Sequence, residues 1–223
     1  MLEAIRIADR RGPGRPLGAF ALGHAKRTVD VILTLLALAF LSPLMAVIAL
    51  SVWVQDQGPV LYFHTRIGRG GKPFRCIKFR TMAVDAAEQL DAYLADNPFA
   101  RAQWLRDHKL RTDPRITRLG RFLRRSSLDE LPQLFNVLAG DMSLVGPRPI
   151  VDAETAKYGI HFQDYCEVRP GITGLWQISG RSNIDYPARV ALDVDYVRSA
   201  SLPLDLKILA LTIPAVLAGR GSY

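Results

Sequence analysis

The chain has 223 residues, 49% of them hydrophobic, and carries a formal net charge of +8 at pH 7. This length suits one domain, or one domain with an appendage, and the apolar, basic composition suits a protein that lies on anionic lipid and handles anionic substrates. Nucleic-acid binding ranks well below, because the basic residues are spread along the chain without a zinc-finger or RNA-binding signature.

The N-terminal part of the chain divides into a basic segment and an uncharged one. Residues 1–25 combine glycines and prolines with arginines, and we predict a mobile tail. Residues 31–54 then run without a charge, which is long enough to span a bilayer because a spanning helix needs about 20 residues. This run is too long and begins too late for a cleaved signal peptide. We therefore expect a membrane segment over residues 26–57.

Ser42 and Pro43 stand in the middle of the apolar run. Proline lacks the N–H that would bond to the carbonyl four residues earlier, and serine can hydrogen-bond back into the preceding turn, so both residues bend a helix. Basic residues flank both ends of the run, and positive residues mark the cytoplasmic side of a membrane. These observations favour a re-entrant helix that dips into the membrane, breaks at Ser42-Pro43 and returns. A spanning helix with an ordinary proline kink is the alternative.

A glycine-rich turn at residues 68–72 separates two short segments that are typical of strands, Val60–Phe63 and Phe74–Phe79. The turn lacks the spacing and the Ser or Thr of a Walker A loop, so we interpret it as a hairpin turn. The two cysteines, Cys76 and Cys166, have no metal-ligand spacing. We expect small core thiols in a reducing cytosol, since a disulfide is possible but not implied.

Beyond the hairpin, the spacing of apolar residues is helical. It predicts amphipathic helices over residues 85–96 and 99–110. An apolar helix is predicted over residues 203–218, and its uncharged stretch is too short to span a membrane. The sequence therefore predicts a predominantly helical α+β fold with a small β-hairpin.

Asp129 and Glu130 are adjacent carboxylates that follow Arg124 and Arg125 and precede Pro132. Fixed positive charge keeps a nearby carboxylate ionised, as a nucleophile toward phosphorus or a metal ligand must be. Plain helix capping is the alternative: with Asp129 as the N-cap, Pro132 falls in the first turn, where proline is tolerated. Capping and chemistry are compatible, because a helix N-terminus also attracts phosphate.

Further cations stand at predicted turns and strand ends, where arginine grips phosphate and lysine binds it as a point charge. They are Lys78, Arg80, Arg148 and Arg181. Taken singly, each is better explained as a solvated surface charge. Asp193 and Asp195 are two residues apart, so on a helix they face nearly opposite ways and cannot both line one site.

Seven motifs, in order along the chain, resemble the monotopic phosphoglycosyl transferase superfamily of bacterial sugar transferases, which starts polysaccharide assembly on a polyprenyl-phosphate carrier. The motifs are Lys26-Arg27-x-x-Asp30, Ser42-Pro43, Lys78-Phe-Arg-Thr-Met82, Asp113-Pro-Arg-Ile-Thr117, Ser127-Leu-Asp-Glu-Leu-Pro-Gln133, Gly140-Asp-Met-Ser-Leu-Val-Gly-Pro-Arg-Pro149 and Arg169-Pro-Gly-Ile-Thr-Gly-Leu-Trp176. They cover roughly residues 26–212. The resemblance is to the minimal, exopolysaccharide-initiating form, without the four-helix membrane bundle of larger relatives.

This resemblance implies a catalytic dyad formed by Asp129 and Glu130. In the family's reaction the aspartate attacks the β-phosphate of a nucleotide-diphosphate sugar, and polyprenyl phosphate then takes the sugar phosphate from the enzyme. For this chain the resemblance implies a UDP-sugar donor, undecaprenyl phosphate as the acceptor, and Mg²⁺ held by the dyad. The substrate-binding residues that it implies are Lys78, Arg80, Arg124, Arg148, Arg181 and Asp193. Arg181 and Asp193 correspond to the nucleotide end of the site.

The resemblance also implies a monotopic enzyme of the inner (cytoplasmic) membrane. Residues 26–57 would form the re-entrant helix, and residues 58–223 an interfacial catalytic domain on the cytoplasmic face. Other membrane lipids, and downstream glycosyl transferases, are the expected neighbours. A non-catalytic membrane scaffold of a polysaccharide assembly complex is the alternative, and the intact dyad counts against it. Nothing in the sequence identifies the sugar.

Overall fold

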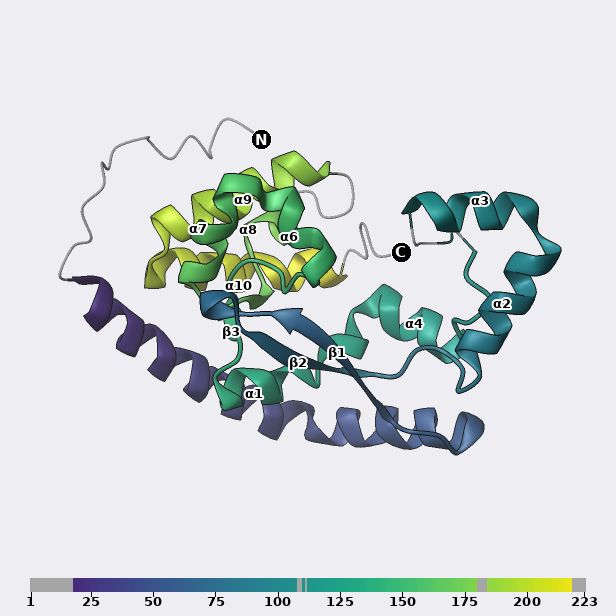
Figure 1. Ribbon diagram of the computed structural model, residues 1–223. Coiled ribbons are helices and arrows are strands. Elements are labelled where there is room, and N and C mark those ends of the chain that lie inside the picture. Colours follow the sequence, from purple (N-terminus) through teal and green to yellow (C-terminus); the bar gives the residue numbers. More distant parts are fainter. Residues whose placement is uncertain (1–17, 108–109, 111, 180–183, 218–223) are drawn as a thin grey trace.

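The computed structural model describes residues 18–107, 110, 112–179 and 184–217. Within them the fold is mostly helical with two small two-stranded sheets, which confirms the predicted α+β class (Figure 1). Residues 1–17 of the predicted tail, and Arg181, lie outside the described residues. The helices are α1 (Gly18–Asp56), α2 (Ala86–Asp96), α3 (Pro98–Asp107), α4 (Arg118–Ser126), α5 (Gln133–Ala139), α6 (Asp152–Tyr158), α7 (Phe162–Glu167), α8 (Leu175–Ser179), α9 (Tyr186–Ser199) and α10 (Leu202–Leu217). The strands are β1 (Leu61–Ile67), β2 (Pro73–Phe79), β3 (Ser143–Val145) and β4 (Gly171–Thr173), and the 3₁₀ turns are η2 (Arg69–Gly71), η3 (Leu128–Glu130) and η4 (Gly159–His161).

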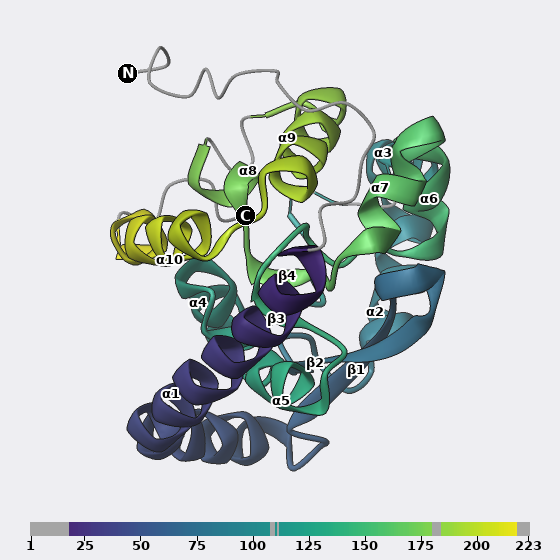
Figure 2. The same cartoon turned by 90° about the vertical axis from the view of Figure 1, so that its left-hand side faces the viewer.

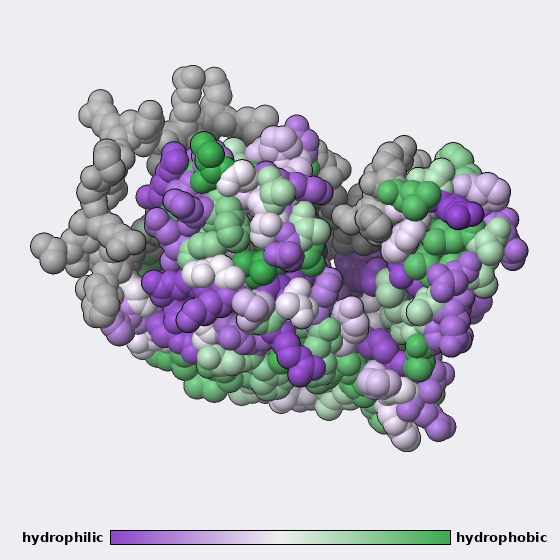
Figure 3. Space-filling view, in the orientation of Figure 1, coloured by the Kyte–Doolittle hydropathy of each residue, from purple (hydrophilic) through white to green (hydrophobic). Residues whose placement is uncertain are grey.

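The predicted membrane segment is the long helix α1, which runs along one edge of the molecule (Figures 1 and 2). Residues 18–25 of the predicted tail already belong to it. Among the described residues, α1 is the one helix that is long and apolar enough to cross a membrane, and 11% of its most apolar stretch is buried. Large apolar side chains of α1, Phe40 and Val54 among them, are exposed, and hydrophobic residues gather along this lower edge of the molecule (Figure 3). The core helix of a soluble protein would bury such a strip.

α1 continues through Ser42 and Pro43 instead of breaking there. Ser42 Oγ donates a hydrogen bond to the carbonyl of Ala39 at 3.1 Å, the expected bond back into the preceding turn. The helix changes direction along its length (Figure 1), as proline causes when it lacks an N–H and crowds the preceding turn. The predicted break is therefore a bend in a continuous helix. The re-entrant path through a membrane stays a prediction.

Charged side chains near the start of α1 attach it to the globular part. Arg27 donates to two carbonyls at the end of α5, at 2.5 and 2.9 Å. Asp30, which is 5% exposed, accepts from Ser143 Oγ at 2.8 Å and from a backbone N–H of β3 at 3.2 Å. Lys26 pairs with Asp205 of α10 at 2.6 Å. Because buried charges are stable only when they are paired and hydrogen-bonded, the Lys-Arg-x-x-Asp motif fixes α1 to the domain.

The predicted hairpin is confirmed, with β1 and β2 paired antiparallel and Tyr62 opposite Lys78. Gly70 and Gly71, in the turn, have φ of 70° and 71°, a region that glycine enters without steric cost. Alternate residues of a strand face the same side, so Lys78 lies on one face of β2 and Phe79 on the other. Phe79 is buried in a cluster with apolar residues of α1 and α4, which ties the end of the hairpin to the long helix.

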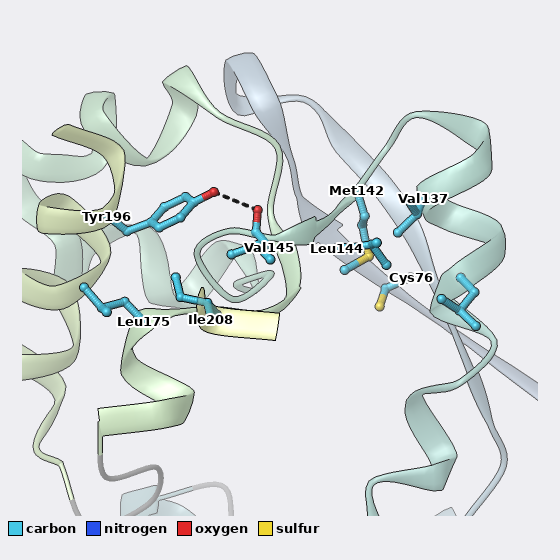
Figure 4. Close-up of a cluster of buried hydrophobic side chains, with 9 residues drawn as sticks. Cys76, Val137, Met142, Leu144, Val145, Leu175, Tyr196 and Ile208 are labelled. Carbon is cyan, nitrogen blue, oxygen red and sulfur yellow. Dashed lines mark hydrogen bonds between the residues drawn. The ribbon is translucent and has the colours of Figure 1, made fainter. Parts of the chain in front are cut away.

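The core of the globular part is built around β3 and β4, which pair in parallel. Apolar side chains of α5, α8, α9 and α10 pack around this pair, and Figure 4 shows part of the cluster. Tyr196 of α9 donates its hydroxyl to the carbonyl of Val145 at 3.0 Å (Figure 4). Cys76 is buried in the same cluster, Cys166 is half-buried, and both are free thiols as predicted. α2, α3 and α10 confirm the three predicted helices within a few residues at each end.

Candidate active site

The adjacent carboxylates lie on a tight turn between α4 and α5. α4 closes at Ser127, whose φ is 57°, and η3 then carries Asp129 and Glu130. The predicted N-cap role of Asp129 is wrong, because α5 begins at Gln133 with Pro132 as its N-cap. Proline's fixed φ and missing N–H suit the entry to a helix. The 3₁₀ turn, and not the helix N-terminus, therefore presents both carboxylates to the neighbouring strand β2.

The two carboxylates differ in exposure and in partners. Asp129 is 8% exposed. The side chain of Glu130 is 29% exposed, and its Oε1 accepts a hydrogen bond from Lys78 Nζ at 2.5 Å. Arg124 adds positive charge near Asp129, and Arg148 adds it near Glu130. Carboxylates ringed by lysine and arginine suit the binding of a phosphate group or of a metal–phosphate complex.

The environment drives the pKa values of the two carboxyls apart. Burial and the neighbouring charge of Glu130 raise the pKa of Asp129 to about 6, and Lys78 and Arg124 oppose them only in part. Burial would also raise the pKa of Glu130, but the charges of Lys78 and Arg148 outweigh it and hold that pKa below its usual value. Arg124 lowers the pKa of Asp129, as the sequence predicts, but burial is the larger effect and the net shift is upward. Divergent titration of two adjacent carboxyls is typical of functional sites.

Arg66 is a cation of this site that sequence reasoning missed. Its charge acts on Glu130 and on Arg148, and its Nη1 donates to the carbonyl of Pro149 at 3.2 Å. In the β1–β2 register Arg66 stands on the same face of the hairpin as Lys78. The predicted hairpin could have revealed Arg66. Once Lys78 is assigned to the site, any cation on the same face of the hairpin becomes a candidate, and Arg66 is one.

The other predicted binding residues lie in different places. Lys78, Arg124 and Arg148 surround the dyad, as the electrostatic effects above show. Arg80 instead pairs with Asp56 at the end of α1. Arg181 lies outside the described residues. The structure therefore places Lys78, Arg124 and Arg148 near the carboxylates. It places Arg80 at the end of α1 instead.

Asp193 lies in a buried polar cluster on α9 and not at the dyad. It is 2% exposed and accepts the hydroxyl of Tyr158 on Oδ2 at 2.7 Å, whereas Asp195 is exposed, as the helical spacing predicts. Burial raises the pKa of Asp193 to about 6 against the Tyr158 hydrogen bond and the charges of Arg189 and Arg148. Arg148 therefore acts on both carboxylate sites and connects the dyad with this cluster.

Two residues could hold a divalent metal, Asp129 and Glu130. Mg²⁺ in nucleotide enzymes is commonly bound by one or two carboxylates together with substrate phosphates, and a cation would relieve the repulsion that contributes to the raised pKa of Asp129. Among the described residues there is no group of three or more His, Cys, Asp or Glu that could form an all-protein metal cage. The dyad therefore fits a metal that is shared with a phosphate substrate.

The exposed apolar helix indicates membrane association, and a pair of carboxylates surrounded by cations suits chemistry on phosphate groups. Residues 22–219 match the bacterial sugar transferase family, and the chain belongs to this family. The family predicted from the sequence motifs is thus confirmed, and so is the prediction of an enzyme.

The chain is similar to exopolysaccharide production proteins and to undecaprenyl-phosphate sugar transferases. The chain is 48% identical over 217 residues to the exopolysaccharide production protein ExoY of Rhizobium meliloti, covering 97% of this chain and 94% of ExoY. It is 50% identical over 198 residues to the undecaprenyl-phosphate galactose phosphotransferase of Salmonella typhimurium, covering 89% of this chain and 41% of that protein. It is 41% identical over 220 residues to the UDP-glucose:undecaprenyl-phosphate glucose-1-phosphate transferase of Caulobacter vibrioides, covering 95% and 76%. The chain thus spans about two fifths of the length of the Salmonella relative and nearly all of ExoY.

Proposed function

We propose that this protein transfers a sugar-1-phosphate, most simply a hexose-1-phosphate, from a UDP-sugar to undecaprenyl phosphate, as the first membrane step of exopolysaccharide or glycoconjugate biosynthesis. The observation that carries the proposal is the Asp129–Glu130 dyad among Lys78, Arg124 and Arg148, on a domain fixed to α1. The names of the Salmonella and Caulobacter relatives support both substrate classes.

In the first half of the proposed reaction, a carboxylate oxygen of Asp129 attacks the β-phosphorus of the UDP-sugar. The bond from that phosphorus to the oxygen that bridges the two phosphates breaks, and UMP departs with the electron pair. With a pKa of about 6, Asp129 is mostly ionised at neutral pH and needs no separate base. Lys78, Arg124 and Arg148 neutralise charge that builds on the phosphate oxygens.

In the second half, an oxygen of undecaprenyl phosphate attacks the same phosphorus. The bond between phosphorus and the Asp129 oxygen breaks, which regenerates the carboxylate and gives undecaprenyl diphosphate-sugar. A covalent intermediate allows a soluble donor and a lipid acceptor to use one site in turn. Each half exchanges one P–O bond for another, so no oxidant or further reactant is needed.

Glu130 keeps its negative charge through its pairing with Lys78. We propose that Asp129 and Glu130 hold Mg²⁺ when the donor binds. Bound there, the metal would supply charge neutralisation on the diphosphate and stabilise the departing oxygen. By family resemblance, Arg181 and Asp193 belong to the nucleotide end of the donor.

The proposed location is the cytoplasmic face of the inner membrane, with α1 entering and leaving on that face. The basic flanks of the apolar run support it, as does the exposed apolar surface of α1. A non-catalytic scaffold would need the membrane helix but not the cation-ringed dyad, so the site itself favours the enzyme.

The test is a donor half-reaction without acceptor. Incubation with UDP-glucose or UDP-galactose should add the mass of one hexose phosphate to the intact protein and release UMP. Asp129→Asn should form no adduct, and Asp195→Asn, a change at an exposed carboxylate, should behave as the wild type. An adduct that persists on Asp129→Asn would move the nucleophile elsewhere. Release of UDP as the main nucleotide would contradict the mechanism, because a glycosyl transferase cleaves between sugar and diphosphate.

A further inference from the structure

Arg66 is a cation that is held in place by hydrogen bonds to uncharged groups. Its side chain is 14% exposed. Nη1 donates to the carbonyl of Pro149 at 3.2 Å, and Nη2 lies 3.1 Å from Nδ1 of His64. Oε2 of Glu154 stays 3.9 Å away and accepts a backbone N–H instead, whereas Lys78 pairs directly with a carboxylate. These hydrogen bonds orient the guanidinium without neutralising its charge, which leaves that charge for an anionic ligand.

His64 is the uncharged side chain that holds Arg66. The two residues are two apart on β1 and lie on the same face of the hairpin. A guanidinium can only donate hydrogen bonds, so Nδ1 of His64 is the acceptor and the imidazole carries its proton on Nε2. Burial and the charges of Arg66 and Lys78 lower the pKa of His64, against the opposing charge of Glu154, which favours this neutral form. The ring of Tyr62, with its centroid 5.9 Å from that of His64, packs beside the imidazole.

Arg66 and Arg148 are two cations that the fold holds close enough to repel each other. Burial lowers the pKa of Arg66, and the charge of Arg148 lowers it further. The loop that carries Arg148 is attached to the end of β1: Arg66 donates to the carbonyl of Pro149, and the N–H of Ile67 donates to the carbonyl of Ile150 at 2.9 Å. An anion that binds to both arginines would relieve their repulsion.

The proposed reaction consists of two displacements at one phosphorus. In-line geometry places the departing oxygen of UMP on the side of the phosphorus opposite the attacking oxygen of Asp129. The acceptor later displaces that same Asp129 oxygen, so its own attacking oxygen enters from the side that UMP has left. The phosphate of UMP and the phosphate of the acceptor therefore occupy one position in turn, which we call the shared phosphate position.

The cations of the site divide between the two carboxylates. The charge of Arg124 acts on Asp129, the proposed nucleophile. The charges of Arg66 and Arg148 act on Glu130, beside the nucleophile. A cation at the nucleophile stabilises the phosphoryl group under attack, whereas cations displaced from it suit the phosphate on the far side of the phosphorus. Arg66 and Arg148 are therefore the pair that suits the shared phosphate position.

We propose that Arg66 binds the phosphate at the shared phosphate position together with Arg148, and that His64 is the positioning residue of Arg66. The inference rests on the proposed function. UMP and undecaprenyl phosphate are both phosphate monoesters, each with close to two negative charges and three acceptor oxygens. A pair of oriented guanidinium groups suits that ligand, because arginine binds phosphate oxygens through two parallel hydrogen bonds.

Binding of UMP alone, measured by calorimetry in detergent micelles with Mg²⁺, tests the role of Arg66 without any turnover. Arg66→Met should weaken UMP binding about tenfold or more, the loss expected for a charge-assisted hydrogen bond. Arg66→Lys should recover part of that loss, because it restores the charge. The matched control is Arg75→Met, which removes an exposed arginine on the other face of the same hairpin and should leave UMP binding unchanged.

Two changes at His64 separate positioning from packing. His64→Phe keeps a ring beside Tyr62 but removes the acceptor, so it should weaken UMP binding about three- to tenfold. His64→Asn offers Oδ1 as an uncharged acceptor in place of Nδ1 and should bind UMP within about twofold of the wild type. Equal losses in both variants would show that His64 acts by packing alone and would overturn its positioning role.

The second half-reaction tests whether the position is shared. Protein that has been loaded with hexose phosphate and freed of donor is mixed with undecaprenyl phosphate in detergent micelles, and loss of the adduct is followed by intact-protein mass. Arg66→Met should raise the KM for the acceptor about tenfold or more, while the rate at saturation stays within about threefold. An unchanged acceptor KM would confine Arg66 to the donor and overturn the shared phosphate position.

A double variant distinguishes direct binding from support of the loop. Arg66→Met combined with Arg148→Met should bind UMP more weakly than Arg148→Met alone. Equal UMP affinities in these two proteins would show that Arg66 only supports Arg148, and would overturn the inference. Adduct formation by the wild type, together with unchanged UMP affinity in Arg66→Met, would overturn the inference and leave the proposed function intact. Failure of the wild type to form any adduct would instead contradict the proposed function itself.

Discussion

Removal of the Lys78 ammonium is the sharpest test of the electrostatics of the dyad. Lys78 Nζ lies 2.5 Å from Glu130 Oε1, and its charge lowers the pKa of both Glu130 and Asp129. In Lys78→Met the aliphatic part of the side chain is kept and the charge is lost. Two adjacent carboxylates then face each other with Arg124 and Arg148 as their remaining counter-charges.

The size of the effect can be bounded from this geometry. Two unit charges about 4 Å apart interact by about 4 kcal/mol at an effective dielectric constant of about 20. The Lys78 and Glu130 side chains are 19% and 29% exposed, so solvent screens part of this interaction. We assign the same screened interaction, about 2–3 kcal/mol, to Lys78 and the charge that builds on the phosphate in the transition state, so its loss should slow the donor half-reaction roughly 30- to 150-fold.

The direction of the pH effect is equally specific. Loss of the positive charge raises the pKa of Asp129 further above its present value of about 6. A higher pH is then needed to ionise the nucleophile, so the variant should be most impaired at low pH and should recover partly as the pH rises.

The assay is the rate of adduct formation from donor alone, followed by intact-protein mass between pH 5 and 9. Lys72→Met, at an exposed lysine in the hairpin turn, is the matched control and should match the wild type. Equal loss at every pH would show that Lys78 acts on the substrate alone. A Lys78→Met rate within a few-fold of the wild type at low pH would refute the electrostatic reasoning altogether.

Three further predictions test membrane path, linkage and packing. A cysteine in the β1–β2 turn and one before α1, in a cysteine-free background, should both resist a membrane-impermeant label in intact cells, and replacing Ser42 and Pro43 with leucine should expose the N-terminal one. For Asp193, the pKa of about 6 in the folded state exceeds the ordinary value near 4, so the folded state holds the proton more tightly. The free energy of unfolding should therefore fall by about 3 kcal/mol as the pH rises from 4 to above 6. Asp193→Asn should lose this dependence in denaturant titrations. In Gly120→Ala the new Cβ would lie 1.9 Å from a backbone oxygen of Thr81, and thermal unfolding should show a destabilisation of about 1–3 kcal/mol.

The sequence predicted elements well wherever local chemistry decides the structure. Gly70 and Gly71 adopt positive φ in the turn, and apolar spacing located α2, α3 and α10. Local rules failed at Asp129, because Ser127 closes α4 in the left-handed region and a 3₁₀ turn separates it from α5. α1 likewise continues through Pro43, although a proline inside an apolar run predicted a break.

The site was predictable in its residue types but not in its energetics. Adjacent carboxylates and nearby cations are visible in the sequence, and Lys78 does reach Glu130. The raised pKa of Asp129 depends on burial, which is set by tertiary packing. Lys78 pairs with Glu130 whereas Arg80 pairs with Asp56, and this difference depends on where the end of α1 lies. No sequence pattern places Asp56 beside Arg80, because 24 residues separate them.

Both ends of α1 are fixed to the same domain, and this bears on the path of the helix. Near its start, Lys26 pairs with Asp205 at 2.6 Å, and at its end Asp56 pairs with Arg80. If α1 spanned the bilayer, the two ion pairs would lie on opposite sides of a hydrocarbon core about 30 Å thick. One of the two attachments to the domain would then be on the side of the membrane away from the domain. A single water-exposed domain can keep both pairs only if both ends of α1 reach the same face. The two attachments therefore support the re-entrant path over the spanning one, and the path itself stays a prediction that the labelling experiment tests.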